Sequence, residues 1–183
     1  MAKTPSQFST QPFQPLRELE AHAAADASHP PPAPETAQSW SGVGFRLGQQ
    51  RYVVPFDEVS EVLYELRYTS IPGVKPWVKG LANVRGRLLP VVDLNGLLDD
   101  TLSVPSKMRR LIVLEHGEIF VGFVVDEVYG MQHFLLESYQ AQATAAPAKA
   151  QPYIHGAFVN QHSWHVFSLE QLIQSPEFFA VVA

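Results

Sequence analysis

Two short apolar runs separated by turn residues lie in the stretch KGLANVRGRLLPVVDLNGL, residues 79–97. An extended run, Leu81–Val84, is separated from a continuous apolar run, Leu88–Val92, by Arg85 and Gly86. This pattern predicts a tight β-hairpin, because Gly86 can adopt the positive φ that a two-residue hairpin turn requires. A run that is apolar at every position also predicts a strand buried on both faces. The charged tip at Arg85 is then the candidate site, although spacing alone favours the interpretation of Arg85 and Arg87 as ordinary solvated turn charges.

The same reasoning predicts a hairpin and a helix before this stretch. From Trp40 onward apolar and small or polar residues alternate over 43–47, and a Gly-Gln-Gln turn leads into the apolar run Tyr52–Val54. In the segment 57–63, Asp57 is a suitable N-cap and the apolar residues recur at i, i+3 and i+4, which predicts an amphipathic helix. Such a helix would leave its two glutamates, Glu58 and Glu61, outside the buried face. A further strand is predicted at Tyr68–Ile71.

The order of these elements is repeated in the second half of the chain. The corresponding segments are 43–54 with 111–125, 57–59 with 126–128, 77–80 with 153–156, and 91–94 with 166–169. A helical turn is predicted after each of the last two. The repeat therefore predicts two small β-barrels or curled sheets packed side by side, each closed by a short helix. An Ala/Pro-rich insert at 144–151 interrupts the second copy and is predicted to be a mobile loop.

Residues 1–38 differ in composition from the rest of the chain. Proline, serine, threonine, glutamine and alanine dominate, so this segment cannot bury enough apolar surface to offset its ordering entropy. We expect a disordered tail in which Leu16–Ala25 forms at most a marginal helix. A connecting loop is predicted at 99–107.

Composition narrows the possible functions. The chain has 183 residues, and 13 basic against 18 acidic side chains give a formal net charge of −5. This charge does not favour nucleic acid, whose phosphates select basic surfaces. The absence of cysteine excludes disulfides and thiolate chemistry. Apolar runs stay well below the roughly 18 to 20 residues of a membrane span, and residues 1–25 contain no signal-peptide core, so a cytoplasmic protein is expected.

No catalytic constellation is recognisable in the sequence, and neither a cofactor nor a metal is expected. The glycines of 42–48 have the wrong spacing for a dinucleotide loop. His155, His162 and His165 lie close in sequence, but a third ligand with an oriented carboxylate is missing, so a structural or surface role is expected for them. The acidic pairs at 57–58, 99–100 and 126–127 are interpreted as caps and solvated turns.

Four stretches together resemble the CheW-like domain, the coupling module of bacterial chemosensory arrays. They are FRLGQQRYVVPFDEVSEVL, GLANVRGRLLPVVDL, GFVVDEVYGM and IHGAFV, and the most specific part is N-x-R-G followed by P-V-x-D-L. The resemblance implies a mainly β fold of two SH3-like five-stranded β-barrel subdomains with short helices. On this basis we expect the domain at 39–181, with barrels near 40–104 and 107–175 that can exchange strands.

By the same resemblance the protein is a non-catalytic adaptor. It would couple the cytoplasmic tip of a methyl-accepting chemoreceptor to the regulatory domain of a CheA-type histidine kinase, and it would be recruited to membrane-associated receptor arrays. WSGVGFRLG and YTSIPGVKPWVKGLANVRGRLLPVVDL are most similar to family members from type IV pilus (twitching motility) systems. Ser168 departs from the family, whose second copy usually carries Asp or Asn at this position.

The resemblance also implies a set of partner-binding residues. Arg85 matches the motif arginine tied to receptor and kinase coupling, Glu61 matches its acidic partner, and Val59 matches a receptor-groove position. The expected partner-binding residues are thus Arg85, Glu61, Val59, Gly86, Asn83 and Val84. A guanidinium held by a carboxylate at a hairpin tip would present an ordered donor fork to a partner.

An alternative from another class is a small β-barrel that binds single-stranded nucleic acid. Its basis is a basic and aromatic neighbourhood made of Lys75, Lys79, Arg85 and Arg87 with Trp77 and Tyr68. The acidic net charge and the absence of a second basic strip count against it.

Overall fold

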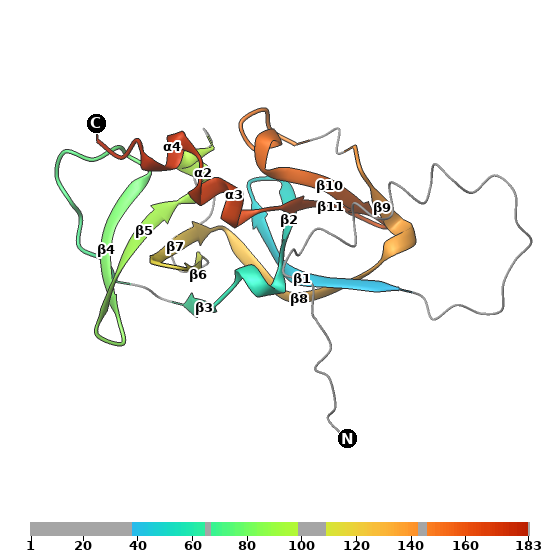
Figure 1. Ribbon diagram of the computed structural model, residues 1–183, viewed down its shortest axis with the longest axis horizontal. Helices are drawn as coiled ribbons and strands as arrows, with labels where there is room; N and C mark the ends of the chain where they lie inside the picture. The colour runs from blue at the N-terminus through green and yellow to red at the C-terminus, as the bar shows by residue number, and fades with distance from the viewer. Residues whose placement is uncertain (1–37, 65–66, 99–108, 143–145, 183) are drawn as a thin grey trace, which may run out of the picture.

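The computed structural model describes residues 38–64, 67–98, 109–142 and 146–182, which form two β-sheets joined by short helices (Figure 1). The predicted tail, its helix at Leu16–Ala25 and the connecting loop at 99–107 lie outside the described residues, apart from Gln38.

One sheet has six strands in the order β8-β1-β2-β11-β10-β9. The strands are β1 (Ser39–Leu47), β2 (Gln50–Pro55), β8 (Glu127–Leu135), β9 (Tyr139–Gln140), β10 (Ile154–Val159) and β11 (Ser163–Phe167). The predicted first hairpin is confirmed as β1 and β2, which pair antiparallel from Gly42 with Pro55 to Leu47 with Gln50.

The other sheet has five strands in the order β3-β6-β7-β5-β4. They are β3 (Glu61–Tyr64), β4 (Val78–Val84), β5 (Arg87–Asp93), β6 (Arg110–His116) and β7 (Ile119–Val125). The hairpins β4-β5 and β6-β7 confirm two further predictions. The parallel pairs β5-β7 and β2-β11 connect strands that are distant in sequence, so each sheet combines strands from both halves of the chain.

Short helices connect the strands and close the two sheets. They are η1 (Phe56–Glu58), α2 (Leu94–Leu97), η3 (Leu136–Ser138), η4 (Gln151–Tyr153), α3 (Leu169–Ile173) and α4 (Pro176–Phe179). The predicted helical turns after the two related strands are thus α2 and α3. Among the described residues, no helix combines the length and apolar character needed to cross a membrane.

Three hydrophobic clusters hold the sheets together. The largest combines Phe45 of β1, Phe123 of β7 and Leu172 of α3, so it is shared between both sheets and the helices. A second cluster, around Trp40, Phe134, Phe158 and Trp164, belongs to the six-stranded sheet, and a third, around Leu89, Val91 and Val113, belongs to the five-stranded sheet. The predicted mainly β fold with two packed subdomains and short helices is confirmed, with the two-residue β9 as a sixth strand in one sheet.

The internal repeat is visible in the backbone at two glycines. Gly80 and Gly156 both have positive φ, of 143° and 108°, and both lie where the register of their strands shifts. A neighbouring backbone crosses closely at each point: a Cβ on Gly80 would lie 2.0 Å from the carbonyl oxygen of Thr69, and one on Gly156 would lie 2.5 Å from that of Gln140. The same device thus begins β4 and β10.

The predicted helix over 57–63 is wrong. Only Phe56–Glu58 is helical, as a 3-10 turn, and Glu61–Tyr64 is the edge strand β3, paired with β6. Backbone pairing with a distant strand decides this segment and overrides the local 3.6-residue period. Glu58, predicted to lie outside the buried face, is buried, and Asp57 forms no cap.

Two smaller predictions about strands are also corrected. Tyr68–Ile71 is not a strand, because it contributes a single bridge, Thr69 with Leu81. Leu88 and Pro90 of β5 are exposed, whereas Leu89 and Val91 are buried, so the run is covered on both faces only from Val91 onward. The shared core does not extend far enough to cover the first half of β5.

Candidate partner-binding surface

The β4-β5 turn forms the tip of its hairpin. Arg85 and Gly86 form the two-residue turn with φ of 52° and 82°, which is the type I′ geometry that matches the twist of a hairpin. Asn83 Oδ1 accepts a hydrogen bond from the backbone N–H of Gly86 at 2.9 Å. The prediction for Gly86 is confirmed, and Arg85 shares the left-handed conformation, which side chains other than glycine adopt infrequently. The strained backbone is therefore held by the flanking strands and by Asn83.

Arg85 and Glu61 form an ion pair at this tip. The Arg85 Nη2 lies 2.9 Å from Glu61 Oε2, and the side chains are 81% and 19% exposed. A pair this exposed stabilises the fold by only about 0–1 kcal/mol. Its physical effect is orientation, because the carboxylate on β3 holds one edge of the guanidinium while the rest faces solvent.

A second arginine at the base of the tip is held in a similar way. Arg87 Nη1 lies 2.8 Å from Glu115 Oε1 on β6, and its guanidinium lies 3.9 Å from the ring centre of Phe120 on β7. Sequence reasoning did not pair Arg87 with any residue, because Glu115 is remote in the chain. The tip therefore presents two fixed guanidinium groups, each neutralised by a carboxylate of a neighbouring strand.

The remaining predicted residues, Val59 and Val84, are less exposed than Arg85. Val59 follows η1 and is half-buried against the shared core. Val84 is buried in the cluster of the five-stranded sheet, so its side chain supports the tip from inside. Leu88, which sequence reasoning placed inside a buried strand, is 67% exposed directly beside the turn and adds an apolar contact surface.

Glu58, the last residue of η1, contacts the start of α3. Its carboxylate accepts hydrogen bonds from Ser168 Oγ at 3.0 Å, from Leu169 N at 2.6 Å and from Glu170 N at 3.2 Å. Burial raises the pKa of Glu58 to about 7, and its hydrogen bonds oppose that shift only in part. No local signal could identify this contact, since Glu58 and Ser168 are separated by most of the domain.

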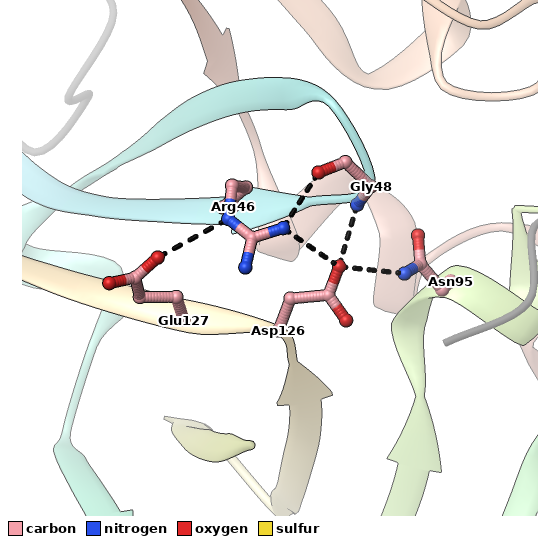
Figure 2. A network of polar contacts seen from close by, with 5 residues as sticks. All are labelled: Arg46, Gly48, Asn95, Asp126 and Glu127. Atoms are coloured by element: carbon pink, nitrogen blue, oxygen red, sulfur yellow. Dashed lines mark hydrogen bonds and ion pairs between the residues drawn. The ribbon is translucent and has the colours of Figure 1, made fainter. Parts of the chain in front are cut away.

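Asp126 is a second buried carboxylate, interpreted from the sequence as part of a solvated turn. It is fully buried. Its Oδ2 accepts from Gly48 N at 2.7 Å and from Asn95 Nδ2 at 3.4 Å, and Arg46 Nη1 lies 3.6 Å away; Figure 2 shows how these residues converge. Arg46 also reaches Glu127 at 3.3 Å. The network joins the β1-β2 turn, α2 and the β7-β8 junction, so it fixes the relative position of the two sheets.

The histidines that are close in sequence near the C-terminus lie in different environments. Among the residues with defined positions, no group of three His, Asp or Glu side chains could hold a metal ion. His162 is exposed, and His165 is buried with its Nε2 3.3 Å from Gln50 Oε1; burial lowers the pKa of His165.

Most of the basic side chains of the alternative nucleic-acid site are paired with carboxylates. Arg85 and Arg87 are paired as described, Lys79 lies 3.0 Å from Asp93, and Trp77 is buried where no base could stack on it. A single-strand binder needs free basic groups and open aromatic faces. This geometry does not favour a binder of single-stranded nucleic acid.

Comparison with known proteins agrees with this architecture. The family model described as "CheW-like domain" matches residues 41–177. This chain belongs to the CheW-like family. Protein PilI of Pseudomonas aeruginosa is 49% identical over 170 residues, which cover 93% of this chain and 96% of that protein.

Other members of the CheW-like family match at lower identity. The chemotaxis protein CheW of Klebsiella aerogenes is 26% identical over 73% of this chain and 81% of its own length. The crystal structure of the scaffolding protein TtCheW from Thermoanaerobacter tengcongensis superposes with a TM-score of 0.65 at 23% identity, covering 76% of this chain and 96% of that one. That structural likeness concerns the fold.

Proposed function

We propose that this CheW-like protein is a non-catalytic adaptor that couples a methyl-accepting chemoreceptor to a CheA-type histidine kinase in the control of type IV pili. The pilus assignment rests on the similarity to PilI over nearly the whole chain. The coupling role rests on the family and on the similarity to chemotaxis and scaffolding proteins named CheW. The protein would work at membrane-associated receptor arrays in the cytoplasm.

The observation that carries the proposal is the ordered tip. Arg85 is exposed on a turn with a restrained backbone, and Glu61 orients its guanidinium. An arginine fixed before binding loses less side-chain entropy when a partner engages its free N–H groups. Leu88 beside it supplies apolar area, which is the combination expected at the centre of a protein interface.

The tip can be tested by reversing its charge. We expect Arg85→Glu to fold normally, because the side chain is exposed, but to bind the kinase regulatory domain or the receptor tip at least about tenfold more weakly. Calorimetric titration of the purified proteins measures the affinity, and thermal unfolding checks the fold. Lys149→Glu makes the same charge change on the segment before η4 and should bind as the wild type does.

A second variant separates loss of the surface from loss of the fold. Val91→Asp places an unpaired charge in the core of the five-stranded sheet, so we expect it to unfold the protein and abolish binding. Wild-type affinity in a folded Arg85→Glu protein would rule out the tip as the interface. Pull-down from the native cell should recover a methyl-accepting receptor together with a CheA-type kinase, and their absence would contradict the adaptor role.

A further inference from the structure

Two related helices, α2 and α3, begin with different capping arrangements. Asp93 precedes α2, and its Oδ1 accepts from Gly96 N at 3.0 Å. Ser168 precedes α3, and its Oγ accepts from Gln171 N at 3.2 Å. A carboxylate is present at α3 as well, but Glu58 supplies it from η1, and it accepts from Ser168 Oγ and from the first two backbone N–H groups of the helix.

The segment that Glu58 joins to α3 leads directly to the candidate surface. Val59 and Glu61 follow Glu58 in the chain, and Ser60 N donates to Val113 O of β6 at 2.8 Å. Between residues 56 and 61 the chain passes from the six-stranded sheet to the five-stranded one. Along this passage the chain is attached by the Ser60 bond, by the Glu58 carboxylate and by the packing of Val59 against the shared core. Glu61 itself pairs with Val113 in the β3-β6 ladder, and the segment that leads into it carries these attachments.

We propose that Glu58 is a positioning residue that fastens the segment 56–61 to the start of α3 and thereby holds Val59 and Glu61 in place for partner binding. This proposal rests on the proposed adaptor function. Helix α3 packs in the core shared by both sheets. Under this proposal it supports a binding surface that lies on the five-stranded sheet alone.

Several charged or titratable groups lie on the elements packed against Glu58. Glu170 on α3 is a like charge, and it is paired with His116 at the end of β6, whose Nδ1 lies 2.9 Å from Glu170 Oε1. The other charged groups on the adjoining elements are Asp57 on η1, Arg46 on β1, which is paired with Glu127, and Arg110 and Glu115 on β6.

The pKa of Glu58, raised to about 7 by burial, means that the fold favours the neutral carboxyl. When pH rises through this value, the ionised carboxylate is more stable in water than in its buried position. Movement of Glu58 toward water would displace η1 as well. Glutamine at this position reproduces the neutral form, because its Oε1 can accept from the helix N–H groups while its Nε2 donates to Ser168 Oγ.

Hydrogen exchange on the full chain tests the attachment without any partner. In Glu58→Ala we expect the protection factor of the Ser60 amide to fall at least about tenfold, since three donors lose their acceptor, while amides of β6 and β7 keep theirs. Glu58→Gln should restore protection. Equal protection of Ser60 in wild type, Glu58→Ala and Glu58→Gln would overturn the proposal.

Binding of the kinase regulatory domain, measured between pH 6 and pH 8, tests the consequence. We expect wild-type affinity to fall several-fold as pH rises, Glu58→Gln to be nearly flat, and Glu58→Ala to be weak throughout. His116→Gln controls for the neighbouring histidine and should retain the wild-type slope.

Loss of Ser60 protection with unchanged binding would overturn the positioning role. Absence of binding by the wild type would instead refute the adaptor function, and the exchange result would still decide whether Glu58 holds the segment.

Discussion

At the scale of single residues, the side chains that matter most here are charged groups held by partners distant in sequence. Arg85 is held by Glu61, Arg87 by Glu115, and Glu58 by the start of α3. The first two pairs are exposed, so they orient more than they stabilise. Glu58 is different, because a buried carboxylate loses hydration that its hydrogen bonds replace only in part.

This difference predicts how stability depends on pH. The folded protein keeps the Glu58 proton up to about pH 7, whereas the unfolded chain releases it near 4.5. The folded state therefore binds more protons in this window, so the contribution of Glu58 to the free energy of unfolding decreases as pH rises, by up to about 3 kcal/mol.

Urea unfolding of wild type and Glu58→Gln at pH 5 and pH 8 measures this contribution. We expect the free energy of unfolding of Glu58→Gln, minus that of the wild type, to be larger at pH 8 than at pH 5. A difference that stays constant between the two pH values would mean that the pKa of Glu58 is close to its ordinary value.

At the scale of elements, both halves of the chain use the same construction. A hairpin strand begins at a bulge with a left-handed glycine, another backbone crosses there, and the following strand ends at a capped short helix. Thr69 crosses at Gly80, and Gln140 crosses at Gly156. Neither crossing leaves room for a Cβ. Glycine is therefore required at both positions for two reasons, the positive φ and the lack of space.

Alanine substitutions test this requirement. We expect Gly80→Ala and Gly156→Ala each to lower the free energy of unfolding by about 3 kcal/mol, through backbone strain and collision with a carbonyl oxygen. Gly117→Ala is the matched control, because its φ of 59° is also positive but the surrounding space is open, and we expect it to cost about 1 kcal/mol. Equal losses at the three positions in chemical denaturation would show that the crossings add nothing.

At the scale of the whole molecule, the two halves depend on each other. The pairs β5-β7 and β2-β11 each join a strand from the first half of the domain to one from the second half. The largest hydrophobic cluster also contains residues from both sheets. The Asp126 network adds a polar connection between the β1-β2 turn and α2. The sheets should therefore unfold together.

Cutting the chain tests this dependence. We expect fragments 1–104 and 105–183, expressed separately, to lack a cooperative unfolding transition, because each would leave half of a sheet unpaired. Mixing them should restore β-sheet circular dichroism. A cooperative transition in either fragment alone would contradict the shared architecture.

The sequence alone determined the hairpins, the tip at Arg85-Gly86 and the order of the repeated elements. Each of these depends on residues close together in the chain, through alternation of apolar positions or the backbone freedom of glycine. The ion pair of Arg85 with Glu61 followed from resemblance to the CheW-like family, and the structure contains it.

Only the tertiary structure decided the rest. The segment after η1 became strand β3 because β6 was available to pair with it, although its apolar period fits a helix. Leu88 stayed exposed because the shared core ends before it, and Glu58 was buried because α3 returns to it from the far end of the domain. In each case the deciding partner is remote in sequence, and its proximity is a consequence of folding that no local pattern encodes.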